Sequence, residues 1–113
     1  MKRTSVTYLR GFRVLVGDEH SQAASMVLMP GGREGGPDNH HRGADQWLYV
    51  ESGVGKATVN GHAYRLKRGT LLLIQRGDNH EIRNVGNRPL KTLNFYVPPA
   101  YRADGQELAR GHS

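Results

Sequence analysis

Turn-forming residues cut this chain into short segments, and this spacing limits the possible folds more than any other feature. Short runs rich in β-branched, aromatic and leucine residues alternate with stretches of glycine, proline, asparagine and aspartate. No run shows ten or more residues of helical periodicity. The expected strands are residues 6–9, 12–17, 25–29, 46–51, 55–60, 63–67, 70–74, 80–84 and 90–97.

Two of the intervening regions carry strong local signals. Asn60-Gly61 lies between β-type residues, and this dipeptide tolerates positive φ at both central positions of a hairpin turn. Residues 30–39, PGGREGGPDN, contain four glycines and two prolines, so we expect a loop that forms a flexible lip over the mouth of a barrel. The pattern as a whole predicts an all-β sandwich or small barrel.

The length of 113 residues suits a single domain, residues 1–113, whose polar tail at 98–113 wraps the surface or is disordered. The absence of cysteine excludes disulfides and thiolate metal sites. No apolar run approaches the roughly 20 residues of a membrane span. Arg10 and Arg13 interrupt the N-terminal apolar stretch, which does not fit a signal peptide. We therefore expect a cytoplasmic protein without membrane contact.

A net charge of +6 makes nucleic acid the first partner to test. The basic residues are scattered, however, and the densest cluster is only Arg65, Lys67 and Arg68. No helix carries a basic stripe and no aromatic ladder is visible. Nucleic-acid binding is therefore the weakest of the functions considered below.

Three of the six histidines lie where a metal site could form. His40 and His41 precede a short turn, RGAD, after which Gln46 begins a strand, and His80 follows a similar turn, RGDN. Because alternate residues of a strand share a face, Asn39 and His41 lie together, and His40 faces the other way. If the two turns lie at one end of a barrel, Asn39, His41, Gln46 and His80 converge in its mouth. For His20, His62 and His112 we expect exposed positions without a function.

The segment NHHRGADQWLYVESG resembles the first sequence motif of the cupin superfamily. That motif reads Gly, five residues, His-x-His, three or four residues, Glu, six residues, Gly. In this chain His41 stands at the second histidine, Gln46 at the glutamate and Gly53 at the closing glycine. Asn39 occupies the first histidine position, and Arg33 occupies that of the opening glycine.

The segment GTLLLIQRGDNHEIRN resembles the second cupin motif, which reads Gly, five residues, Pro-x-Gly, two residues, His, three residues, Asn. Gly69, Gly77, His80 and Asn84 match it, and Gln75 replaces the proline. The resemblance covers roughly residues 25–97. It is closest to small single-domain cupins and implies a double-stranded β-helix, a jelly-roll barrel.

The resemblance also implies a divalent metal, which the family holds with three histidines and a carboxylate. Strict alignment here gives two histidines, one glutamine and one asparagine: His41, His80, Gln46 and Asn39. A bulge at Asn39-His40 would instead turn His40 inward and restore three histidines. If only three residues separate the second histidine from the carboxylate, Asp45 stands at the carboxylate position. The six residues that the motif requires before the closing glycine, Gly53, favour Gln46 instead.

The replacement of the carboxylate by an amide changes the expected chemistry of the site. An amide does not neutralise the charge of a dication, so the metal should bind more weakly and should be one for which imidazole is a good ligand. The expected cofactor is a single divalent ion: nickel, zinc, copper, iron or manganese. The more positive site would favour an anionic substrate.

Strand alternation predicts the rest of the pocket. Leu48 and Val50 should point inward with Gln46, whereas Trp47 and Tyr49 should face outward. Ile82 and Asn84 should share the face of His80. On the last strand we expect the apolar set to line the core in preference to Thr92, Asn94 and Tyr96; that set is Leu93, Phe95 and Val97. Tyr96 and Arg76, close to the His80 turn, and Phe95 are the candidate substrate contacts.

Two classes of function fit these residues. In the first, the protein is a metal-dependent enzyme, such as an oxygenase or isomerase, that acts on a small molecule. In the second, it is a small-molecule binding or sensor module without turnover. The lost carboxylate favours the second slightly, and fold alone hosts both. Exposed edge strands further predict a homodimer in which the N-terminal strands are exchanged or packed together.

Overall fold

The computed structural model describes residues 1–40 and 43–106, with only the backbone for residues 36–40. The described part of the chain is all-β, as the turn spacing predicts, and contains nine strands. They are β1 (Gly11–Gly17), β2 (Gln22–Leu28), β3 (Arg33–His40), β4 (Asp45–Ser52), β5 (Gly55–Val59), β6 (His62–Leu66), β7 (Leu71–Ile74), β8 (Asn79–Asn84) and β9 (Leu90–Val97).

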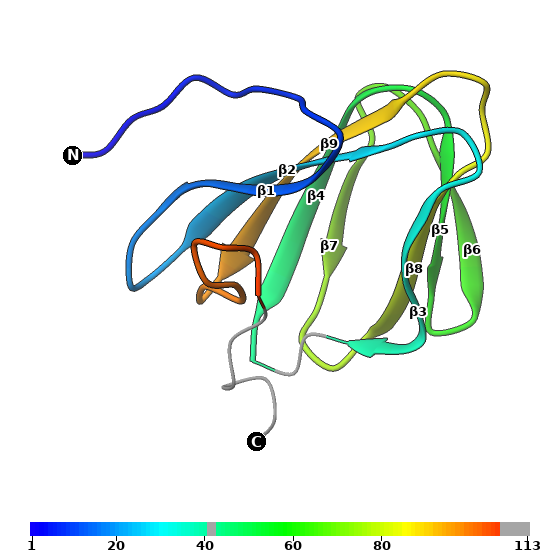
Figure 1. Cartoon of the computed structure of the whole chain (residues 1–113). Helices are drawn as coiled ribbons and strands as arrows, with labels where there is room; N and C mark the ends of the chain where they lie inside the picture. Colours follow the sequence, from blue (N-terminus) through cyan, green and yellow to red (C-terminus); the bar gives the residue numbers. More distant parts are fainter. Residues whose placement is uncertain (41–42, 107–113) are drawn as a thin grey trace.

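The strands form two antiparallel sheets that face each other (Figure 1). The five-stranded sheet has the order β1-β2-β9-β4-β7, and the four-stranded sheet has the order β3-β8-β5-β6. Sequence neighbours therefore often lie in opposite sheets, as when the chain passes from β3 to β4 and from β7 to β8. This crossing brings residues from both cupin-like motifs to the space between the sheets.

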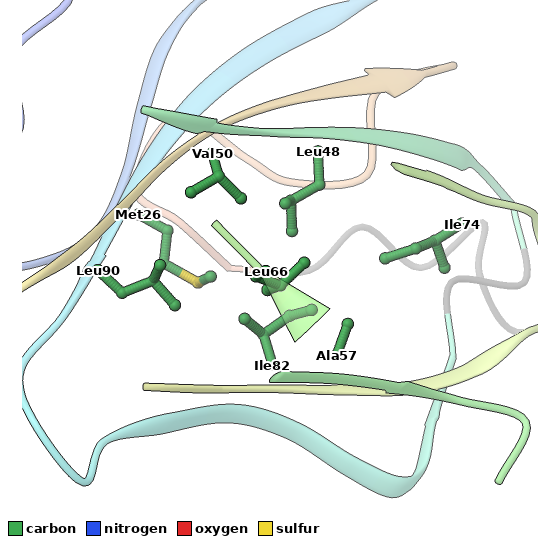
Figure 2. Close-up of a cluster of buried hydrophobic side chains, with 8 residues drawn as sticks. All are labelled: Met26, Leu48, Val50, Ala57, Leu66, Ile74, Ile82 and Leu90. Atoms are coloured by element: carbon green, nitrogen blue, oxygen red, sulfur yellow. The ribbon is translucent and has the colours of Figure 1, made fainter. Parts of the chain in front are cut away.

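The hydrophobic core fills that space. Figure 2 shows Leu48 and Val50 of β4 pointing from one sheet toward Ala57 and Ile82 of the other. The alternation predicted for β4 and β8 is confirmed, because Gln46, Leu48 and Val50 are buried, as are His80, Ile82 and Asn84. The remaining buried members of the cluster are Met26, Leu66, Ile74 and Leu90.

The predicted loop at residues 30–39 is wrong, because most of it belongs to β3. Arg33, Glu34 and Gly35 pair in antiparallel register with Arg83, Ile82 and Glu81 of β8. The glycine and proline signals describe local preference, but hydrogen bonds to a distant strand override it. The register then shifts, because the next pair is His40 with Asn79. From the Gly35–Glu81 pair to this one, β3 advances by five residues and β8 by only two. Such an irregularity is a β-bulge in the broad sense.

Two further expectations about strands are wrong. Residues 6–9 form no strand but part of an extended N-terminal segment, drawn in dark blue in Figure 1. On β9, the buried residues after Leu90 are Thr92, Asn94 and Tyr96, whereas Phe95 and Val97 are exposed on the outer face. Polar side chains occupy the inner face of β9 because they hydrogen-bond to one another and to Gln46, as described below.

The outer face of the five-stranded sheet carries several apolar residues. Trp47 of β4 is 40% exposed, as expected from its parity, and pairs in register with Leu73 of β7 and Phe95 of β9. Within the described ranges, no helix is long and apolar enough to cross a membrane.

Candidate functional site

A small cavity lies between the two sheets, and residues from both line it. Its volume is about 10 Å³, roughly the space needed for one water molecule or one metal ion. A small organic molecule is too large for it. The lining residues are Phe12, Met26, Glu34, Gln46, His80, Ile82, Tyr96 and Tyr101.

Gln46 is the best-defined polar residue of this cavity. Its side-chain nitrogen Nε2 donates a hydrogen bond to Asn94 Oδ1 at 3.0 Å, and Asn94 Nδ2 in turn donates to Thr92 Oγ1 at 3.0 Å. The other end of the amide, Gln46 Oε1, is buried and has no hydrogen-bond partner among the described residues. The chain of hydrogen bonds therefore orients the carbonyl oxygen of Gln46 as an available acceptor.

His80 is buried, and the turn before it is fixed by side-chain hydrogen bonds. Asp78 accepts a bond from the Gln75 amide at 2.9 Å and another from Asn60 Nδ2 at 2.9 Å. Asn60 Oδ1 accepts from the amide of Asn79, also at 2.9 Å. Asn60, at the Asn-Gly turn with a φ of 50°, thus ties the β5–β6 hairpin to the turn that presents His80.

Asn84, the last residue of the second motif, has a structural role in this chain. Its Nδ2 donates to the backbone oxygens of Leu28 and Arg88, each at 2.8 Å, and its Oδ1 accepts from the amide of Gly86 at 2.9 Å. These bonds hold the β8–β9 turn against the end of β2. Asn84 therefore positions the strand that carries His80 and does not line the cavity.

The segment after β9 closes one side of the cavity. Gln22 Nε2 donates to the backbone oxygen of Tyr101 at 2.7 Å, and Gln22 Oε1 accepts from the Tyr101 amide at 3.1 Å. The ring of Tyr101 packs against Phe12 and Tyr96, with centroid separations of 4.6 and 5.0 Å. Tyr101 thus belongs to the site, which the polar composition of residues 98–113 did not indicate.

Tyr96, one of the three candidate substrate contacts, lies in the cavity wall. Burial, followed by the nearby Tyr101 and Glu34, raises its pKa well above the ordinary value, so the phenol is neutral at physiological pH. A neutral phenol in this place serves as a hydrogen-bond donor or packing surface and not as an anion.

The other two candidate contacts lie elsewhere. The amide of Arg76 donates to Asp45 Oδ1 at 2.9 Å, and its side-chain Nε lies 3.6 Å from the same oxygen. Both side chains are partly exposed and neither lines the cavity, so Asp45 is engaged by Arg76 and does not replace Gln46 there. Phe95 faces outward, 39% exposed.

Glu34 is a cavity residue that the sequence analysis missed, because it lies in the segment expected to be a loop. It pairs in register with the buried Ile82 and therefore projects from the same face of the sheet. Glu34 is an exposed residue, yet desolvation raises the pKa of its carboxyl group. Neither composition nor motif spacing identifies Glu34; only the pairing of β3 with β8 does.

The structure does not describe the side chains of the three remaining predicted ligands. His41 lies outside the described residues, and for Asn39 and His40 only the backbone of β3 is described. The register shift falls between Gly35 and His40, and the position expected for a bulge, Asn39-His40, lies at the end of that stretch. Among the residues whose side chains are described, no group of three or more histidines, aspartates and glutamates is arranged to hold a metal ion.

Comparisons with known proteins identify the family of the chain. Residues 24–96 match the family model of the cupin domain. Over 72 residues the chain is 36% identical to the tetracenomycin polyketide synthase protein TcmJ of Streptomyces glaucescens, covering 64% of this chain and 46% of that protein. An uncharacterized protein of Methanocaldococcus jannaschii is 31% identical over 68 residues, covering 60% and 54%. The chain thus matches about half the length of these relatives.

Solved structures agree with this result. A protein from Bacillus halodurans superposes with a TM-score of 0.72 at 28% identity, covering 88% of this chain and 76% of that one. A predicted oxalate decarboxylase from Thermotoga maritima superposes with a TM-score of 0.70 at 26% identity, covering 78% and 79%. The two facing sheets, the two motifs and these matches together show that the chain belongs to the cupin domain family and has its double-stranded β-helix fold.

Proposed function

We propose that this cupin domain binds one divalent transition metal ion in the cavity and that a small molecule binds at the cavity mouth. The ligands would be His80, His41 and the Oε1 atom of Gln46, with His40 or Asn39 completing the set. The observation that carries the proposal is the buried, unpartnered Gln46 oxygen, in a cavity that His80 also lines and that has room for one ion. Imidazole nitrogen and amide oxygen suit nickel, zinc, copper, iron or manganese.

The role of the small molecule follows from the size of the cavity. Because about 10 Å³ does not admit an organic ligand, that ligand would meet the metal from outside, past Glu34 and the Tyr101 segment. A bound metal would act as a Lewis acid toward an oxygen of the ligand. The buried phenol of Tyr96 and the ring of Phe12 would exclude water from the inner side. The relatives named for oxalate decarboxylation and polyketide synthesis support a role in small-molecule chemistry.

Elemental analysis of untagged protein, purified with metal supplied and then dialysed, tests the metal. We expect about one ion per chain in the wild type, strongly reduced in His80→Ala and His41→Ala. His62→Ala is the matched control, because His62 is exposed at the start of β6. A wild type without stoichiometric metal, or a His80→Ala variant that retains it, would overturn the proposal.

A second measurement separates the two classes of function. Turnover of a small molecule that is lost on chelation and in His80→Ala would identify a metal-dependent enzyme, such as an oxygenase or isomerase. Metal and ligand binding without turnover across a substrate panel would identify a binding or sensor module. Homodimer formation and a cytoplasmic location remain predictions, and light scattering of the purified protein tests the former. Nucleic-acid binding remains the weakest option, tested by titration with DNA at two salt concentrations.

A further inference from the structure

We propose that Glu34 supplies the carboxylate that this chain lacks at position 46, so that the metal is held by a carboxylate from β3 and an amide from β4. The inference rests on the proposed metal site. It assigns a ligand that neither sequence motif specifies, because Glu34 falls in the five-residue spacer of the first motif. Glu34 also belongs to the opposite sheet from Gln46.

The first argument is the register of β3 and β8. Glu34 lies directly opposite Ile82, and His80 lies two residues from Ile82 on the same face. Glu34 and His80 are therefore diagonal neighbours, whose Cβ atoms are typically about 7–8 Å apart or slightly less. Two long side chains can close that separation on a single ion, since metal–nitrogen and metal–oxygen bonds are each about 2.0–2.2 Å. Both residues line the same cavity as Gln46.

The second argument is the charge environment of Glu34. The nearby Glu81, which lies opposite Gly35 in the ladder, forms ion pairs with Arg33 at 3.7 Å and Arg83 at 3.6 Å. Within the described part of the chain, no lysine or arginine forms such a pair with Glu34. Glu34 is an exposed residue, but its carboxyl group is desolvated enough to raise the pKa of that group, and charges withdrawn from water are normally paired or bound to a metal. A cation in the cavity would therefore satisfy a charge that the described residues leave without a counter-ion.

The third argument is the charge of the metal itself. Histidines and a glutamine are neutral ligands, so they would leave a dication uncompensated beside an apolar core. A single carboxylate halves that net charge, whether it is supplied by Glu34 or by a glutamate at position 46. The site can therefore keep the one carboxylate that the family uses to offset the charge of the metal, with this carboxylate on β3 of one sheet and not on β4 of the other.

Relocating the carboxylate tests this idea. We would measure metal affinity by competition with a chelator in wild type, Glu34→Gln, Gln46→Glu and the double variant Glu34→Gln/Gln46→Glu. Glu34→Gln should weaken binding at least about tenfold. The double variant should recover to within about threefold of wild type, because it returns one carboxylate to the site. Glu81→Gln, which removes the outward-facing acid of β8, should leave affinity unchanged.

The outcomes distinguish this inference from the proposal on which it rests. If wild type binds no metal, the proposed function fails and this inference fails with it. If His80→Ala loses the metal while Glu34→Gln keeps wild-type affinity, only the role of Glu34 is refuted. A double variant that stays as weak as Glu34→Gln also refutes it, because a ligand role predicts recovery.

A measurement on the wild type alone avoids dependence on how the variants fold. In protein labelled with ¹³C at the glutamate carboxyl groups, zinc addition should shift the Glu34 signal and leave that of Glu19, in the exposed β1–β2 turn, unchanged. An unshifted Glu34 signal in protein saturated with zinc would refute the proposal.

Discussion

The amide of Gln46 is held by Asn94, whose Oδ1 accepts a hydrogen bond from Gln46 Nε2 at 3.0 Å. This contact decides which end of the glutamine faces the cavity, because Nε2 is occupied and Oε1 is left available. Asn94→Leu should remove that restraint and weaken metal binding by about tenfold, as loss of an orienting partner commonly does. Thr92→Val is the control, since it removes only the bond to Asn94 Nδ2 and should have a smaller effect. Equal losses in both variants, measured by chelator competition, would contradict the orienting role of Asn94.

The core between the sheets should respond steeply to truncation. Leu48 is fully buried in the main hydrophobic cluster, so Leu48→Ala should lower the free energy of unfolding by about 2–5 kcal/mol. Leu71→Ala, at an exposed position of β7, should cost less than about 0.5 kcal/mol. Urea denaturation measures both values. Similar losses at the two positions would show that the outer face of β7 is covered in solution.

Gly53, the closing glycine of the first motif, should tolerate no side chain. Its φ is +95°, and an added Cβ would lie 2.6 Å from the backbone oxygen of Pro89. Gly61 also has positive φ, at +81°, but a Cβ there meets no atom within 4 Å. Gly61→Ala should therefore show only the backbone strain of about 1–2 kcal/mol. Gly53→Ala should lose more, by roughly a further 1–3 kcal/mol from the clash. Thermal and urea unfolding compare the two variants.

The turn between β1 and β2 should contribute stability that depends on pH. Hydrogen bonds from the amides of His20 and Ser21, at 2.8 and 3.0 Å, lower the pKa of Asp18. Because the folded-state pKa lies below the unfolded one, this contribution is present above the unfolded value and is lost as the pH falls through the folded value. The wild type should therefore be more stable than Asp18→Asn at pH 6, and the difference should shrink below about pH 4. A difference that does not change with pH would rule out an ionic contribution.

The sequence predicted the parts of the site that depend on alternation within one strand. Gln46, Leu48 and Val50 share a face, and so do His80 and Ile82. The motif spacing identifies Gln46 and His80 as inward-facing, and the alternation of side chains along a strand then predicts the other residues of each face. The all-β class followed in the same way from turn spacing, since glycine, asparagine and proline act locally.

The features that were missed depend on contacts between distant residues. The pairing of β3 with β8 turns a glycine-rich segment into a strand and brings Glu34 to the cavity. On β9 the rule that apolar residues face inward failed, because Thr92 and Asn94 are satisfied by hydrogen bonds that reach Gln46. Tyr101 reaches the cavity through Gln22, 79 positions away in the chain. No local pattern contains these partners.

The broken register of β3 has a consequence for how relatives of this chain can diverge. Between Gly35 and His40 the backbone advances five positions while β8 advances two, so the ladder does not fix the length of this stretch. Insertions or deletions there would leave the pairing of Glu34 with Ile82 intact and would change which residues reach the end of the strand. If the proposed metal site is correct, changes in the length of this stretch would alter the donors offered at the end of β3 without rebuilding either sheet.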